Sequence, residues 1–116
     1  MEEVMRKGKN ELPACPVETT MLLISNKWKI FILRELLTGK KRFNELRKSV
    51  TDISQRMLTL NLRSMEEDGI VIRTVFAEVP PRVEYQLSDL GQTLKPVIDV
   101  MWDWGLSYKK RVVDSI

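Results

Sequence analysis

The sequence of 116 residues contains no histidine and a single cysteine, Cys15. Without histidine, neither a Ser-His-Asp triad nor a Cys-His pair can be built, and one cysteine is too few for a structural zinc site. One cysteine also cannot close an intramolecular disulfide, which favours a reducing, cytoplasmic location. We therefore expect neither a metal nor a cofactor, and an enzyme is the least supported class of function.

Long apolar runs and glycine-rich phosphate loops are also absent. No run of about 18 or more apolar residues occurs, so no transmembrane helix is expected, and the polar N-terminus lacks the apolar region of a signal peptide. Neither G-x-G-x-x-G nor G-x-x-x-x-G-K-[ST] is present. With 43% hydrophobic and 30% charged residues, the chain has the composition of a single globular domain.

Basic residues are concentrated in the middle of the chain. The net charge is +3, but residues 27–63 carry 10 basic and 3 acidic side chains, whereas residues 64–116 carry 6 and 9. This excess of positive charge predicts an anion-binding face and points to nucleic acid as a partner. The alternative is that these lysines and arginines only solvate helix surfaces.

Hydrophobic periodicity predicts a mostly helical α+β fold. Pro16 is suited to open a short helix, and Ser25-Asn26 interrupts it and caps a central helix expected from about Lys27 to Leu37, before Gly39. The later elements are expected as an edge strand at 40–42, helices at 43–50 and 55–68, strands at 70–77 and 83–87, and a helix from 89 to about 110 that Pro96 kinks or delays.

The order helix, turn, helix and then two-stranded hairpin is that of a winged helix-turn-helix, whose second helix enters the major groove of DNA. Leu58, Leu62 and Met65 share one face of that helix and are expected to pack on the core. The residues expected to contact DNA are Arg42, Ser54, Gln55, Arg56, Thr59, Leu60, Arg63 and, at the proline-stiffened wing tip, Arg82. Those expected to contact mainly phosphates are Lys40, Lys41, Arg47 and Lys48.

The last helix carries a seam of apolar residues with heptad-like spacing, from Leu90 to Tyr108. One apolar stripe can pack on its own domain, while the other needs a partner, so the sequence predicts a homodimer. The alternative is a helix folded wholly onto its own core. The expected interface residues are Leu94, Val97, Ile98, Met101, Trp102 and Trp104.

In these elements and motifs, the chain resembles the HxlR-type regulators, which are bacterial and archaeal winged-helix DNA-binding proteins related to the MarR group. The resemblance covers roughly residues 15–105 and rests on ordered short motifs, including Lys27-Trp28 and residues 42–46, 53–59, 65–73 and 80–85. Leu60 departs from the family pattern, which more often has a polar residue there. The resemblance implies a cytoplasmic, homodimeric transcriptional regulator that responds to a small molecule or to thiol oxidation.

Cys15 is the candidate sensor residue. It directly precedes Pro16, so we expect it near the N-cap of the first helix, where the helix dipole favours the reactive thiolate. Glu18 opposes this effect by placing negative charge on the same amides. The resemblance adds that a cysteine at this place senses oxidants in some relatives. The alternative is an inert residue packed under the N-terminal arm.

We expect an arm at residues 1–14 that is flexible or docked on a partner, a winged-helix domain with N- and C-terminal dimerisation helices at 15–110, and a tail at 111–116.

The expected function is sequence-specific binding of double-stranded DNA by a homodimeric regulator that responds to oxidants or electrophiles through Cys15. One alternative is a winged-helix module that binds protein, against which the charge of residues 27–63 argues. Another is a regulator with a non-covalent small-molecule effector, for which the candidate pocket residues are Trp28, Trp102, Trp104 and Tyr108.

Overall fold

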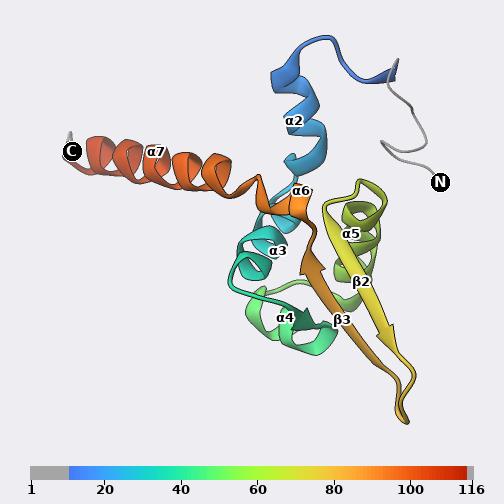
Figure 1. Ribbon diagram of the computed structural model, residues 1–116. Coiled ribbons are helices and arrows are strands. Elements are labelled where there is room, and N and C mark those ends of the chain that lie inside the picture. The colour runs from blue at the N-terminus through green and yellow to red at the C-terminus, as the bar shows by residue number, and fades with distance from the viewer. Residues whose placement is uncertain (1–10, 115–116) are drawn as a thin grey trace.

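The computed structural model of the chain describes residues 11–114. In chain order, its elements are α2 (Pro16–Ile24), α3 (Lys27–Leu37), β1 (Lys41–Arg42), α4 (Phe43–Ser49), α5 (Gln55–Glu67), β2 (Val71–Phe76), β3 (Arg82–Leu87), α6 (Asp89–Gln92) and α7 (Lys95–Asp114). Figure 1 shows α3, α4, α5 and the β2–β3 hairpin gathered into one body, from which α7 extends away. This architecture confirms the predicted winged helix-turn-helix.

The wing is an antiparallel hairpin whose second strand also pairs with β1, giving the sheet order β1-β3-β2. Val71 lies opposite Leu87 in the hairpin, and Arg73 lies opposite Tyr85. Residues directly opposite each other in an antiparallel pair share a face of the sheet. Because Val71, Tyr85 and Leu87 are buried, this face covers the core.

Capping residues and glycines set the helix boundaries that the sequence predicted. The side chain of Asn26 accepts a 2.9 Å hydrogen bond from the backbone nitrogen of Lys29, and that of Ser54 accepts a 3.0 Å bond from Met57. Gly39 and Gly69 follow α3 and α5 with φ angles of +138° and +81°. A side chain would strain the backbone at these angles, so both helices end where glycine occurs.

The core holds α5 by one face. Leu58, Leu62 and Met65 are almost completely buried together with Ile32 and Leu33 of α3, as the sequence predicted. Burying each large apolar side chain contributes roughly 1.5–3 kcal/mol. The opposite face of α5 is therefore presented on a firmly anchored helix.

The C-terminal region forms a short helix and a long one, so of the two outcomes predicted for Pro96, a kink or a delayed start, the delayed start is confirmed. Ser88 caps only the short α6, where its hydroxyl oxygen accepts a 3.0 Å hydrogen bond from the nitrogen of Gly91. The chain turns at Thr93 and Leu94, and α7 starts at Lys95 with Pro96 in its first turn. A proline there removes no intrahelical hydrogen bond, so it delays the start of the helix rather than kinking it.

Two further boundaries differ from the prediction. Leu90 lies in α6 and Val97 in α7, so the expected continuous seam from Leu90 to Tyr108 does not run along one helix. Residues 111–114 belong to α7 rather than to a separate tail. Residues 1–10 of the expected arm and 115–116 of the expected tail lie outside the described residues.

Candidate nucleic-acid interface

The exposed face of α5 brings together the residues predicted to read DNA. Ser54 is the N-cap, and Gln55 and Arg56 are exposed in the first turn. Leu60 is 45% exposed and Arg63 is exposed, whereas Thr59 is half-buried. These positions recur at spacings of three and four residues, so the amphipathic sequence of α5 places them on one arc of the helix.

A hydrogen bond between two asparagines, which the sequence alone does not predict, connects α5 to α3. Asn61 is 5% exposed; its Oδ1 accepts a 3.0 Å hydrogen bond from Nδ2 of Asn26, and its Nδ2 donates a 2.8 Å bond to the carbonyl oxygen of Met57. An unsatisfied buried amide is costly, so these bonds favour one separation of the two helices. The available signal was a polar residue within the buried stripe that contains Leu58, Leu62 and Met65.

The basic residues around α4 divide into paired and unpaired side chains. Lys41 donates a 2.8 Å hydrogen bond from Nζ to Oγ1 of Thr38, and Nζ of Lys40 lies 3.6 Å from Oε1 of Glu84. Arg42 is exposed at the N-cap of α4, and Arg47 and Lys48 are exposed in its last turn. These last three side chains form an accessible basic surface, whereas Lys40 and Lys41 must first leave their partners.

Arg82, which the sequence predicts to reach a minor groove from the wing tip, is held by neighbouring side chains in this structure. Its guanidinium forms ion pairs with Glu78 at 2.8 Å and with Glu84 at 2.6 Å, and its Cζ lies 3.9 Å from the centre of the Phe76 ring. The hydrogen bond to Glu78, together with the charges of both carboxylates, raises the pKa of Arg82 above its ordinary value. The side chain is thus held over Phe76 on the wing by two counter-ions.

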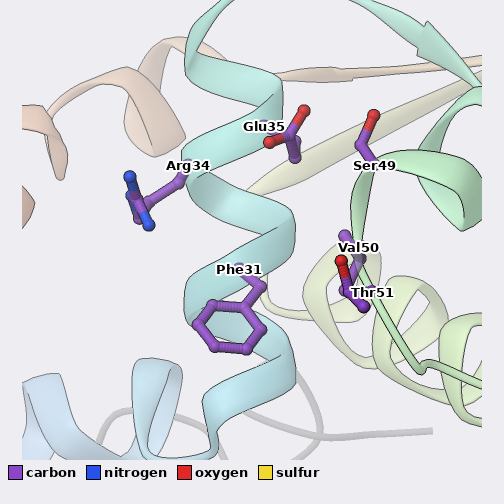
Figure 2. A pocket seen from close by; sticks show the side chains of 6 residues that line it. All are labelled: Phe31, Arg34, Glu35, Ser49, Val50 and Thr51. Carbon is purple, nitrogen blue, oxygen red and sulfur yellow. The ribbon is translucent and has the colours of Figure 1, made fainter.

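A small cleft of about 260 Å³ lies between α3 and the end of α4. Figure 2 shows the side chain of Glu35 extending towards the segment that carries Ser49, while the side chain of Arg34 projects from the opposite side of α3. Arg34 stacks on Trp102, with 4.5 Å between its Cζ and the ring centre. The residues that line the cleft are Phe31, Arg34, Glu35, Ser49, Val50 and Thr51.

The aromatic residues considered as pocket lining do not converge on one cavity. Trp28 packs edge-on against Phe31 with ring centres 6.1 Å apart, and Trp104 stacks on Tyr108 with ring centres 5.4 Å apart.

No helix between residues 11 and 114 combines the length and apolar character needed to cross a membrane. In the same part of the chain, no three acidic, cysteine or histidine side chains lie close enough to hold a metal ion.

An apolar groove of about 660 Å³ separates α2 and the start of α3 from α7. Val17, Met21, Val97 and Met101 are among the residues that line it. Two of the expected interface residues, Leu94 and Ile98, are instead part of the domain's own core. The expected interface residues that remain exposed are Val97, Met101, Trp102 and Trp104.

Cys15 is the N-cap residue of α2, as predicted, and its thiol is free and exposed. Its carbonyl oxygen accepts a 3.1 Å hydrogen bond from the nitrogen of Thr19, and Glu18 lies in the first turn. The alternative of a cysteine packed under the arm involves residues 1–10, which lie outside the described residues. The thiol is accessible to a reagent in the surrounding solvent.

Comparisons with known proteins agree with this architecture. A family model described as an HxlR-like helix-turn-helix matches residues 23–113. The chain is 53% identical over 103 residues to YdeP, an HTH-type transcriptional regulator of Bacillus subtilis, in an alignment that covers 89% of this chain and 80% of YdeP.

Solved structures show a similar likeness. The redox regulator HypR in its reduced form superposes with a TM-score of 0.80 at 48% identity, over 88% of this chain and 100% of HypR. Its oxidised form gives a TM-score of 0.75 at 52% identity, over 80% of this chain and 96% of HypR. At these identities the likeness extends from the fold to the sequence.

Proposed function

Since this chain belongs to the HxlR-like helix-turn-helix family of transcriptional regulators, we propose that it binds specific double-stranded DNA as a homodimer. The observation that carries the proposal is the arc on α5, where Gln55 and Arg56 are exposed while Leu58 and Leu62 anchor the helix. Glutamine and arginine can each make two hydrogen bonds to a purine edge in the major groove. A rigid helix that presents both in its first turn is suited to read sequence.

The other residues of this face have complementary roles in the proposal. Leu60 contacts a thymine methyl group, since it is exposed but has no hydrogen-bonding group. Ser54 and Thr59 provide hydroxyl groups suited to backbone phosphates. Arg42, Arg47 and Lys48 add phosphate contacts from the accessible surface of α4, with Lys40 and Lys41 joining them when they exchange their protein partners for DNA.

The homodimer is supported by apolar surface on α2 and α7. Val17, Met21, Met101 and Trp104 are all more than one third exposed, and the apolar groove lies between the two helices. A second protomer that covered this surface would remove it from water, which favours association. A two-fold dimer would place two copies of α5 about 34 Å apart and require a pseudo-palindromic operator.

An oxidant response through Cys15 is the regulatory part of the proposal. It is supported by the exposed thiol at the N-cap of α2 and by the likeness to HypR, which is described as a redox regulator in reduced and oxidised forms. Because the chain has one cysteine, a disulfide must join two protomers or one protomer and a small thiol. Since α2 borders the apolar groove, either product would change how protomers pack.

The experiment that tests this function is selection of bound duplexes from a random pool, followed by titration of the enriched duplex and a scrambled one. A sequence-specific regulator prefers its operator by about 10³-fold or more. Equal affinity for both duplexes at physiological salt would reject sequence-specific binding and favour the protein-binding winged-helix module. Protection of two half-sites with the same spacing would support the dimer.

A further inference from the structure

A cleft between α5 and the wing contains two arginines from different elements. It encloses about 310 Å³ and is lined by Thr59, Leu62, Arg63 and Glu66 of α5, Arg73 of β2 and Tyr85 of β3. The four α5 residues fall at positions i, i+3, i+4 and i+7, so they share one face of the helix, which turns towards the sheet. Arg73 lies directly opposite Tyr85 in the ladder, so both belong to the face that meets α5.

The two arginines differ from Arg82 in having no counter-ion. Neither Arg63 nor Arg73 forms an ion pair with any described residue, although Glu66 lines the same cleft. Arg63 and Arg73 are both exposed. With two guanidiniums and one carboxylate, the lining carries a net charge of about +1, which suits a ligand with a single negative charge.

Tyr85 supplies an independent observation at the same place. It is only 9% exposed, yet within residues 11–114 no group forms a hydrogen bond with its hydroxyl. Buried tyrosine hydroxyls ordinarily have a partner. The hydroxyl of Thr59 likewise makes no hydrogen bond within this part of the chain. The cleft therefore combines two guanidiniums with two hydroxyl groups that lack partners.

We propose that this cleft binds a phosphodiester group of the DNA backbone, held by Arg63 and Arg73 and hydrogen-bonded by Tyr85 and Thr59. The proposal rests on the proposed function of α5. A sugar–phosphate strand separates each major groove from the adjacent minor groove, and a winged helix places its recognition helix in one and its wing beside it. A cleft between these two elements faces that strand.

The ligand chemistry favours a phosphodiester. The planar guanidinium fork matches two phosphate oxygens, and a phosphodiester carries one negative charge, as the lining requires. Arg63, expected from the sequence on the base-reading arc, is assigned here to the backbone. The sequence alone does not single out Arg73, because one arginine in a strand of alternating polar and apolar residues is typical of an ordinary solvent-exposed position.

The test is the salt dependence of DNA affinity for wild type, Arg73→Gln, Arg73→Lys and Lys110→Gln, on both the enriched and the scrambled duplex. Loss of one phosphate contact should reduce the slope of log K against log salt by about 0.9. We expect this reduction for Arg73→Gln alone, with an unchanged preference for the enriched duplex. Lys110 is exposed near the end of α7, so its variant controls for the loss of one positive charge.

A second variant tests the hydroxyl. Tyr85→Phe retains the buried ring and should weaken binding to both duplexes by about tenfold without changing the salt slope. Thermal unfolding of each variant verifies that it is folded.

A wild-type slope for Arg73→Gln overturns the proposal, as does a changed sequence preference, which would make Arg73 a base-reading residue. If wild type does not prefer the enriched duplex, the proposed function fails, but the slopes on the scrambled duplex still test the cleft.

Discussion

Nδ2 of Asn26 donates a 3.0 Å hydrogen bond to Oδ1 of Asn61, which joins the N-cap of α3 to the buried face of α5. Asn26 simultaneously accepts a hydrogen bond from Lys29 at the start of α3. Asn61 also donates to the carbonyl oxygen of Met57 one turn earlier in α5. The position of α5 is therefore fixed by polar contacts as well as by apolar packing.

Asn61→Ala should lower the free energy of unfolding by about 1–3 kcal/mol, because it removes the hydrogen bond that joins α5 to the N-cap of α3 and leaves a small cavity in the buried face of α5. Denaturant unfolding followed by circular dichroism measures the change. Asn44→Ala, at an exposed position of α4, is the control and should change stability by less than about 0.5 kcal/mol. Equal effects of the two substitutions would show that the asparagine pair does not stabilise the domain.

Glu78→Gln should strengthen DNA binding by about twofold to fivefold, because it removes a negative charge from the wing and replaces one of the two ion pairs of Arg82 with a weaker contact. The gain should be larger on A·T-rich flanks, whose narrow minor groove attracts arginine. Fluorescence anisotropy with two flanking sequences measures it. Asp103→Asn on α7 controls for the change in net charge; a similar gain in that variant would refute a role for the wing.

Met101→Asp should convert the proposed dimer to a monomer at micromolar concentration, because it places a charge on the exposed apolar face of α7. Sedimentation equilibrium measures the mass, and operator affinity should fall with it. Lys110→Asp is the control and should remain dimeric. A monomeric wild type, or a dimeric Met101→Asp protein, would argue against this interface.

Diamide should change the operator affinity of the wild type several-fold and leave Cys15→Ser unaffected, because the exposed thiol is the only one in the chain. The oxidant takes two electrons from a pair of thiols and becomes the hydrazine, while the thiols form a disulfide. Non-reducing electrophoresis distinguishes a linked dimer from a mixed disulfide. If wild-type affinity is insensitive to diamide, Cys15 is not the sensor.

The sequence was most informative where one residue decides a local conformation. Pro16, Asn26 and Ser54 predicted helix starts, and Gly39 and Gly69 predicted helix ends, because caps and positive φ angles depend on short-range chemistry. The amphipathic pattern of α5 likewise separated its buried face from its exposed face. These features place the candidate recognition helix without knowledge of tertiary contacts.

Features that depend on distant partners were not predictable in the same way. Glu78 and Glu84 flank Arg82 in sequence, but their pairing over Phe76 requires the register of the hairpin. The hydrogen bond between Asn26 and Asn61 joins residues 35 positions apart. Leu94 and Ile98 match an interface stripe equally well in the sequence, and their burial in the domain's own core depends on tertiary contacts.

Arg56→Ala compared with Arg47→Ala tests most directly whether α5 reads DNA sequence. Both arginines are exposed, but one lies in the first turn of α5 and the other in α4. Loss of a bidentate base contact should cost about 1–3 kcal/mol on the enriched duplex and relax selection at one base pair. Titration of both variants on enriched and scrambled duplexes should show a reduced preference for Arg56→Ala and an unchanged preference, with uniformly weaker binding, for Arg47→Ala. An unaltered preference in Arg56→Ala would contradict the assignment of α5 as the recognition helix.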